Sequence, residues 1–187
     1  MAINLYEVFD YDIITGNLIW RHRPDHYFSS PCKASYYNSR MTGNVAGIKN
    51  FQVKSGKPHS IIVSVWSHGV GAKTYGVHRI VWEMFNGPIP DGYMVDHVNG
   101  DPFDNRIANL RLATRAQNNQ NTSLRKDNKT GCRGVCWDKK SNKYRVQVRS
   151  NGRRVYNKFF DDLNLAKAAY DEQARIHHGE FVRPIHQ

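Results

Sequence analysis

Two segments of alternating polar and apolar residues near the carboxyl end of the chain are joined by Asn151-Gly152. Asn-Gly between such segments is a strong signal for a two-residue β-hairpin turn, because both turn residues adopt positive φ. The turn fixes the register of the two strands and predicts which side chains share a face. One face pairs Arg149 with Arg154, Gln147 with Tyr156 and Arg145 with Lys158, and the other pairs Val148 with Val155 and Tyr144 with Phe159.

A third strand and a helix complete this part of the chain. The strands are expected over 133–137, 143–149 and 153–160, and a helix is expected over 162–178, closed by Gly179. The helix is expected to cover the apolar face of the sheet with Leu165, Ala166, Ala169, Tyr170 and Ile176. Residues 131–187 are therefore predicted to form a three-stranded antiparallel sheet plus one helix.

Positive charge is concentrated in the same region. The chain has 27 Lys and Arg residues against 16 Asp and Glu residues, a net charge of +11, and residues 121–160 carry 12 basic and 2 acidic side chains. This concentration of positive charge indicates a polyanionic partner, most simply nucleic acid. Like charges that face each other across the predicted hairpin are destabilising, and a bound phosphate would explain them. The alternative is a basic surface that serves only solubility.

Length and composition exclude several classes of protein. A chain of 187 residues, 40% of them hydrophobic, can form one ordinary domain or two small ones and is not expected to be disordered. It has no apolar run of the roughly 18 residues that a membrane-spanning helix needs. Residues 1–10 do not resemble a signal peptide, so we expect a cytoplasmic protein without membrane contact. Cys32, Cys132 and Cys136 are expected to be reduced thiols, too few for a four-cysteine zinc site.

The amino-terminal part, 1–75, has the composition of short strands and turns, with a turn at 15–17 and a buried strand over 61–66. After it, five apolar residues fall on one face of a helix that Gly87-Pro88 ends: Val77, Ile80, Val81, Met84 and Phe85. We therefore expect a β-rich amino-terminal segment followed by a helix.

The next stretch has the pattern of two strands and a helix. Residues 93–98 have strand composition, a turn follows, and 110–112 return as a second short strand. Thr114 and Gln117 fit a capping box, which places Asn118 in the first turn of a helix. Residues 122–130 are polar apart from Leu124 and are expected to link two functional halves.

Four polar residues of this stretch can together supply what phosphodiester hydrolysis needs. The reaction requires a hard cation held by oxygen ligands and a base for the attacking water. Adjacent strand residues point to opposite faces, so the Asp96 carboxylate can bind a metal while the His97 imidazole faces a water. Asn118 can bring a second oxygen to the metal, and Asn109 lies between these residues in the chain.

A run of motifs extends from Val77-His78-Arg79 through Val95-Asp96-His97-Val98-Asn99-Gly100 and Asp104-Asn105-Arg106 to Gln117-Asn118-Asn119. This run resembles the His-Asn-His (HNH) nuclease family in its phage and homing-endonuclease branch. The resemblance implies an α+β protein with a ββα-metal (His-Me finger) core over 76–121. It implies that His97 is the general base, that Asp96 and Asn118 bind one divalent metal, Mg²⁺ or Mn²⁺, and that Asn109 braces the loop between the strands. Asn118 stands where many members have a final histidine, which suits Mg²⁺, and Asn119 is its main rival as ligand.

A second resemblance covers 129–184. Three features carry it: Gly131-Cys132-Arg133-Gly134-Val135, the basic hairpin, and the helix with Ala168-Ala169-Tyr170-Asp171. Together they are similar to the plant APETALA and ethylene-response-factor DNA-binding domain. The resemblance implies a sheet that reads the major groove of duplex DNA. The candidate DNA contacts are Arg133, Trp137, Arg145, Gln147, Arg149, Arg154, Tyr156 and Lys158. Cys136 and Asp138 depart from the plant pattern, so the plant target sequence is not carried over, and core packing is the alternative for Trp137.

Other titratable residues have structural alternatives. His78 and Arg79 are candidates for contact with the scissile phosphate, and the alternative is packing and capping at a helix start. The pair at 177–178 is expected to stabilise a helix end, and the acidic pair at 161–162 is expected to begin a helix rather than to catalyse.

These observations predict a two-part, metal-dependent DNA endonuclease of the homing or phage type. A monomer, which we expect, would nick one strand, whereas a dimer would cut both. The alternative is a DNA-binding regulator whose nuclease core is inactive. An RNA-binding protein is disfavoured, because the RNA major groove is too deep and narrow to be read by a sheet.

Overall fold

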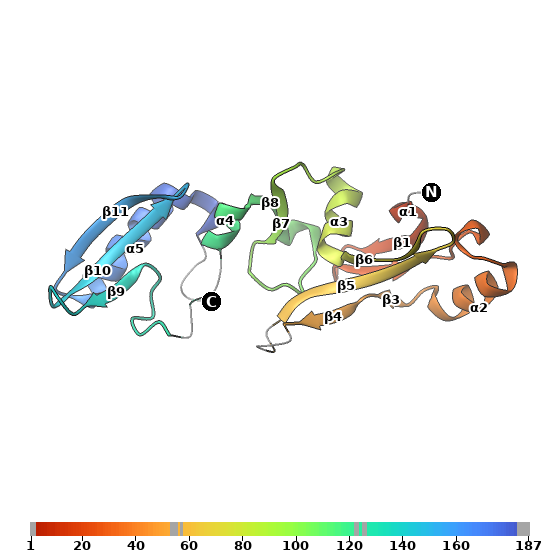
Figure 1. Ribbon diagram of the computed structural model, residues 1–187, viewed down its shortest axis with the longest axis horizontal. Coiled ribbons are helices and arrows are strands. Elements are labelled where there is room, and N and C mark those ends of the chain that lie inside the picture. The colour runs from red at the N-terminus through yellow and green to blue at the C-terminus, as the bar shows by residue number, and fades with distance from the viewer. Residues whose placement is uncertain (1–2, 53–55, 57, 122–123, 125–126, 183–187) are drawn as a thin grey trace. The chain divides into compact units, whose positions relative to one another are not determined.

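The computed structural model describes residues 3–52, 56, 58–121, 124 and 127–182 (Figure 1). The described chain contains both helices and strands, which confirms a mixed fold class. The chain divides into two compact units, Met1–Leu112 and Ala113–Gln187. This division by packing lies nearer the amino terminus than the functional boundary expected at residue 121, and the functional domains stay a prediction. Among the described helices, none is long and apolar enough to cross a membrane.

The described part of the first unit contains two antiparallel sheets of three strands. The first has the order β1 (Phe9–Asp12), β2 (Asn17–Trp20) and β3 (Val45–Ala46), and the short helix α1 (Leu5–Val8) precedes it. The second has the order β4 (Ile48–Phe51), β5 (Pro58–Ser67) and β6 (Gly71–Gly76). The predicted turn at 15–17 joins β1 and β2, and β5 includes the strand predicted over 61–66.

Helix α2 (Pro31–Met41) was missed, and the prediction that 1–75 holds only strands and turns is wrong. The Ser30 hydroxyl caps this helix by accepting from the Lys33 N–H at 3.4 Å. Pro31 occupies its first turn, where a missing N–H costs nothing. The helix buries Ala34 and Asn38. A helix with so narrow a buried face lacks the apolar period by which a sequence reveals an amphipathic helix.

Helix α3 (Val77–Asn86) begins where the periodicity predicted and ends at Gly87, whose φ is 78°. It packs against β5, β6 and β7 (Tyr93–His97) (Figure 1). Its buried face joins one apolar cluster with residues of both sheets: Val8, Phe9, Leu18, Trp20, Val63, Val65, Val77, Ile80, Val81, Val95 and Leu110. The amino-terminal strands and the stretch that carries the nuclease motif therefore share one core.

Strand β8 (Leu110–Thr114) pairs with β7 and leads into helix α4 (Arg115–Gln120), so two strands and a helix follow one another as predicted. The Thr114–Gln117 capping box is present.

In the second unit, β9 (Val135–Asp138), β10 (Lys143–Ser150) and β11 (Arg153–Phe160) form an antiparallel sheet with β10 in the centre. Helix α5 (Leu163–His178) lies across one face of this carboxyl-terminal sheet (Figure 1). Asp162 caps α5, so the acidic pair at 161–162 begins a helix as expected.

The predicted hairpin register holds only next to the turn. Asn151 and Gly152 have φ of 49° and 76°, as the Asn-Gly signal required, and Arg149 pairs with Arg154. The register then shifts by one residue, because β11 bulges at Val155 and Val148 pairs with Tyr156. The pairs predicted beyond this point are wrong. The observed pairs are Gln147–Asn157, Val146–Lys158, Arg145–Phe159 and Tyr144–Phe160.

The bulge moves Tyr156 and Phe160 to the helix-covered face, where both pack against the apolar cluster of the second unit. The residues with which α5 covers this face also differ in part from those predicted. Ala166, Tyr170 and Ala174 are buried, whereas Leu165 and Ile176 are 62% and 64% exposed.

The end of the predicted linker has a defined turn. The Asn128 side-chain oxygen accepts from the backbone N–H groups of Thr130 and Gly131, and its amide group donates to the Cys132 carbonyl. Residues 122, 123, 125 and 126 of the linker lie outside the described residues. The described carboxyl end of this segment is therefore ordered by side-chain hydrogen bonds rather than by a helix or strand.

Candidate active site

The two central residues of the predicted site, Asp96 and His97, lie at the end of β7. Asp96 and His97 are 7% and 9% exposed, although both are polar. Buried polar side chains are retained when other groups satisfy them, so their partners indicate what each can do.

Arg111 on β8 forms an ion pair with Asp96. Its Nε and Nη2 atoms both donate to Asp96 Oδ2 at 3.0 Å. The two side chains are 13% and 8% exposed, so this ion pair is largely shielded from water. The pair fixes the orientation of the Asp96 carboxylate.

His97 contacts a buried amide. His97 Nε2 lies 3.0 Å from Asn105 Oδ1, and Asn105 is 1% exposed. The ring of His78, from the first turn of α3, lies 5.3 Å from the His97 ring, measured between centroids. The structure thus places His78 beside His97, whereas the side chain of its neighbour Arg79 is exposed.

Burial lowers the pKa of His78 from 6.5 to about 4, with smaller contributions from His97, Arg79 and His59. His78 is therefore neutral at pH 7 and can act as a hydrogen-bonding group but not as a cation. Its Nδ1 atom is buried and has no hydrogen-bond partner among the described residues.

This shift predicts a loss of stability in acid. Because the folded state lowers the pKa of His78, its contribution is complete above pH 6.5 and is lost as the pH falls toward 4. We expect His78 to account for up to about 3 kcal/mol of the acid destabilisation at pH 4. Denaturant unfolding at pH 7 and pH 4 should show a smaller pH effect for His78→Gln than for the native chain. Equal pH effects would contradict the assignment.

Asn109 braces the loop between β7 and β8, as the resemblance implied. Its Oδ1 accepts from the Asn99 N–H at 3.0 Å, and its Nδ2 donates to Asn99 Oδ1 and to the Asp104 carbonyl. Asp104 also accepts from the Arg106 guanidinium at 2.6 Å, and this bond lowers the pKa of Asp104. The loop is therefore closed on itself by side-chain bonds.

The β1–β2 hairpin holds the same loop from another side. The Tyr11 hydroxyl donates to the Asn105 carbonyl at 3.2 Å and accepts from the Ile107 N–H at 2.8 Å. A side-chain carbon at Gly16 would lie 2.5 Å from the Arg106 nitrogen, so only glycine permits this approach of the hairpin. Sequence reasoning missed Tyr11, Asn105 and Arg111, because their roles depend on contacts with side chains or backbone on other segments of the fold.

Asn118 lies in the first half of α4. Its side chain makes no hydrogen bond to any residue that the structure describes, and its backbone carbonyl accepts from the Asn121 N–H. Asn119, the rival ligand, lies on the wall of a pocket in the second unit.

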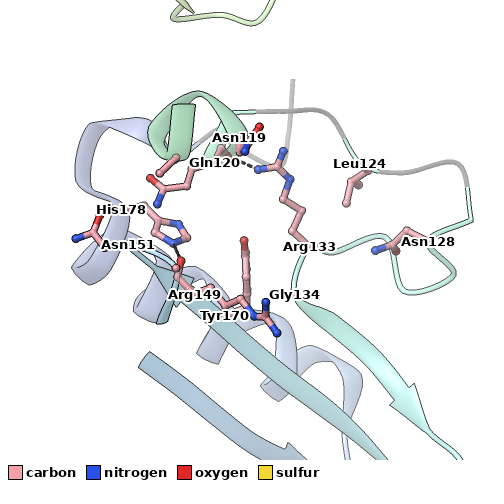
Figure 2. A pocket seen from close by; sticks show the side chains of 12 residues that line it. Asn119, Gln120, Leu124, Asn128, Arg133, Gly134, Arg149, Asn151, Tyr170 and His178 are labelled. Carbon is pink, nitrogen blue, oxygen red and sulfur yellow. Dashed lines mark hydrogen bonds between the residues drawn. The ribbon is translucent and has the colours of Figure 1, made fainter. Parts of the chain in front are cut away.

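That pocket has a volume of about 550 Å³ and lies between α4, the sheet and α5 (Figure 2). The Arg133 guanidinium reaches across it and donates to the Gln120 carbonyl at the end of α4 (Figure 2). On the other wall, His178 Nε2 contacts the Arg149 carbonyl at 2.8 Å. A side chain at Gly134 would collide with the Tyr170 ring, which explains why glycine follows Arg133. Arg133 thus ties α4 to the carboxyl-terminal sheet.

The open face of the sheet, opposite α5, carries a set of polar side chains: Arg145, Gln147, Arg149, Arg154 and Asn157. Arg145 Nε donates to Asn157 Oδ1 at 2.8 Å, and its guanidinium lies over the Phe159 ring. Lys158 lies on the helix-covered side by register, with its ammonium over the Tyr156 ring. Trp137 packs edge-on against Tyr144 and is 44% exposed, so core packing accounts for part of its surface.

Comparisons with known proteins match the stretch of chain in which these residues lie. Residues 75–120 match a family model described as HNH endonuclease. The chain is 36% identical over 106 residues to Protein 3.8 of Escherichia phage T7, which covers 57% of this chain and 87% of that protein. It is 33% identical over 109 residues to an uncharacterized HNH endonuclease of Acanthamoeba polyphaga mimivirus, covering 58% of this chain and 56% of that protein.

A solved structure of the HNH homing endonuclease I-HmuI aligns with 92% of this chain and 88% of its own, at 18% identity and a TM-score of 0.41. The matched family model spans the whole of α3, β7, β8 and α4. From this match we conclude that the chain contains an HNH endonuclease domain, and the phage T7 protein is its relative along most of that protein's length.

Proposed function

We propose that this protein is a divalent-metal-dependent endonuclease that hydrolyses phosphodiester bonds in duplex DNA. The observation that carries the proposal is the buried Asp96-His97 pair at the end of β7, with each side chain held by its own partner. A carboxylate and an imidazole that are adjacent in sequence but separately oriented suit a metal ligand and a general base.

The residues present fit a hard cation. The proposed ligands Asp96 and Asn118 offer oxygen atoms, which hard cations prefer to the thiolate and imidazole ligands common in zinc sites. Mg²⁺ keeps several waters and takes one or two protein carboxylates together with substrate phosphates. Asp96, with the Asn118 amide oxygen as a second ligand, would hold such an ion, Mg²⁺ or Mn²⁺. When bound, the metal would stabilise charge on the phosphate and on the departing 3′ oxygen.

The chain's own residues would perform the remaining steps. His97 takes a proton from the water that attacks phosphorus in line with the departing 3′ oxygen. Asn109 keeps the loop closed so that His97 is presented in one orientation. Arg79, exposed and always charged, would neutralise the phosphate, and neutral His78 would donate or accept a hydrogen bond beside His97.

The carboxyl-terminal sheet would read the major groove of DNA, as its resemblance to the APETALA-type domain implies. The basic residues of its open face, Arg145, Arg149 and Arg154, together with Gln147, present donors toward one side, and bidentate arginine contacts to guanine are common in such readers. DNA contacts by Arg133 and Trp137 stay predictions, whereas the bulge places Tyr156 and Lys158 on the helix-covered side, away from the proposed reading face.

The bulge at Val155 decides which basic side chains lie on the open face of the sheet, and this predicts which of them contribute to DNA binding. Arg149→Ala removes a charge from the open face, so we expect weaker binding and a slope of log K against log salt that is smaller by about 1. Lys158→Ala removes an equal charge from the other face and should change the slope by less than half as much. Fluorescence anisotropy with a labelled duplex at several salt concentrations measures both. An equal or larger effect of Lys158→Ala would contradict the proposed reading face.

The function itself is tested by incubating the purified chain with supercoiled DNA in Mg²⁺, Mn²⁺ or EDTA. We expect nicked circles with either metal and intact DNA in EDTA, because a monomer with one metal site cuts one strand. Linear product would indicate a dimer that cuts both strands. Salt-sensitive binding without cleavage in any metal would overturn the proposal in favour of a DNA-binding regulator.

A further inference from the structure

Asn105 lies at the centre of a chain of contacts that runs from the amino-terminal hairpin to His97. Its side-chain oxygen lies 3.0 Å from His97 Nε2, and its backbone carbonyl accepts from the Tyr11 hydroxyl. Because one residue makes both contacts, the position of the Asn105 backbone decides where the acceptor for the His97 ring lies.

The β1–β2 hairpin contacts the backbone of residues 105–107 at several points. The Tyr11 oxygen bonds to the backbone on both sides of Arg106, accepting from the Ile107 N–H and donating to the Asn105 carbonyl. The missing side chain at Gly16 lets the turn of the hairpin contact the backbone of the same two residues, Asn105 and Arg106. The Tyr11 ring is held in turn by the edge-on contact with Phe85 of α3.

Stability alone does not explain this amide. Asn105 is 1% exposed, and its Nδ2 atom is buried without a hydrogen-bond partner among the described residues. A buried donor without an acceptor is destabilising, whereas a leucine of similar shape would avoid that cost. The side-chain oxygen of Asn105 gives a reason for the amide at this position, because it can accept a hydrogen bond from the His97 ring N–H.

We propose that Asn105, held by Tyr11 of the amino-terminal hairpin, is the positioning residue that fixes the orientation and tautomer of His97. The inference rests on the proposed function. With Asn105 Oδ1 as acceptor, the His97 proton resides on Nε2 and the lone pair that takes the proton from water is on Nδ1. The amino-terminal strands then serve the reaction directly as part of the support of the base.

Nitrogen-15 spectroscopy of the imidazole gives a test that does not depend on cleavage. Long-range ¹H–¹⁵N spectra of the full chain at a pH where the rings are neutral distinguish the two tautomers, and the signal that His97→Ala removes identifies His97. We expect the Nε2–H tautomer in the native chain and in Asn105→Asp, which keeps an acceptor oxygen, and a mixture of tautomers in Asn105→Leu. An Nδ1–H tautomer, or no change in Asn105→Leu, would overturn the proposal.

Single-turnover cleavage supplies the second readout. Asn105→Leu should lower the rate about 10–100-fold with the DNA dissociation constant within about twofold of native, as for other residues that orient a reacting side chain. Asn105→Asp should restore most of the rate. Asn38→Leu, at a buried asparagine distant in sequence from the site, controls for the loss of a buried amide in general.

The role of Tyr11 is tested by a double-mutant cycle. Tyr11→Phe should slow cleavage about 3–10-fold, and Tyr11→Phe combined with Asn105→Leu should be no slower than Asn105→Leu alone, because both changes act through the same contact. Tyr6→Phe, which removes a comparable bond from a tyrosine hydroxyl to the Met84 carbonyl, should leave the rate unchanged. Additive effects of the two changes would overturn the link through Asn105.

The two proposals fail in different ways. If the native chain does not cleave DNA with any metal, the proposed function is wrong, while the tautomer of His97 still tests the contact. If the native chain cleaves, His97→Ala does not, and Asn105→Leu cleaves at the native rate with a native melting curve, only the positioning role is wrong.

Discussion

His97→Ala is expected to lower the single-turnover rate of DNA cleavage by about 10²–10⁴-fold, the usual contribution of a general base. The imidazole is buried at the end of β7 and is oriented by Asn105, so no exposed side chain replaces it. Alanine removes the base without adding charge or volume. Rates at saturating protein, measured on a labelled duplex in Mg²⁺, give this effect directly.

The matched control for this variant is His68→Ala. His68 is exposed in the turn after β5, so its removal should change neither cleavage nor folding. DNA affinity, measured in EDTA, should be unchanged in both variants, because the proposed reading face lies in the other compact unit. A His97→Ala rate within threefold of native would exclude His97 as the base.

Arg111→Ala is expected to produce the largest loss of stability. It removes both N–H donors from Asp96 Oδ2 in a pair that is 13% and 8% exposed. Removing one partner of a buried ion pair costs about 3–5 kcal/mol, because the other charge stays buried. For a chain of this size the melting temperature should fall by roughly 6–20 °C, as measured by calorimetry or circular dichroism.

A double variant separates the charge effect from lost packing. Asp96→Asn combined with Arg111→Met removes both charges and should be more stable than Arg111→Ala alone. Added Mg²⁺ or Mn²⁺ should raise the melting temperature of Arg111→Ala more than that of the double variant, because a bound cation stabilises the folded state when Asp96 is its ligand. A melting curve of Arg111→Ala equal to that of the native chain would show that the pair does not hold Asp96.

Local patterns predicted the elements on which the candidate site is built. The 3.6-residue period from Val77 found α3, and the Thr114–Gln117 capping box placed the start of α4. The Asn151-Gly152 turn found the hairpin of the carboxyl-terminal sheet. Each of these signals depends on residues within one or two turns of chain, where the sequence determines conformation most directly.

The features that sequence reasoning missed depend on distant contacts or on a single extra residue. The bulge at Val155 shifts the register because Tyr156 gains burial beside Val148, and alternation alone cannot reveal such a shift. Helix α2 has too few buried residues to show a period. Tyr11 meets the Asn105 carbonyl across 94 positions of the sequence, so neither residue could be assigned to the site from its neighbours.

The most direct test of metal-dependent hydrolysis by His97 is cleavage of a defined duplex in ¹⁸O-labelled water with Mg²⁺, followed by mass spectrometry of the ends. Attack of a water with departure of the 3′ oxygen predicts one ¹⁸O atom in a 5′-phosphate, a free 3′-hydroxyl, and no product in EDTA or with His97→Ala. A 3′-phosphate, product in EDTA, or equal product from His97→Ala would contradict the account.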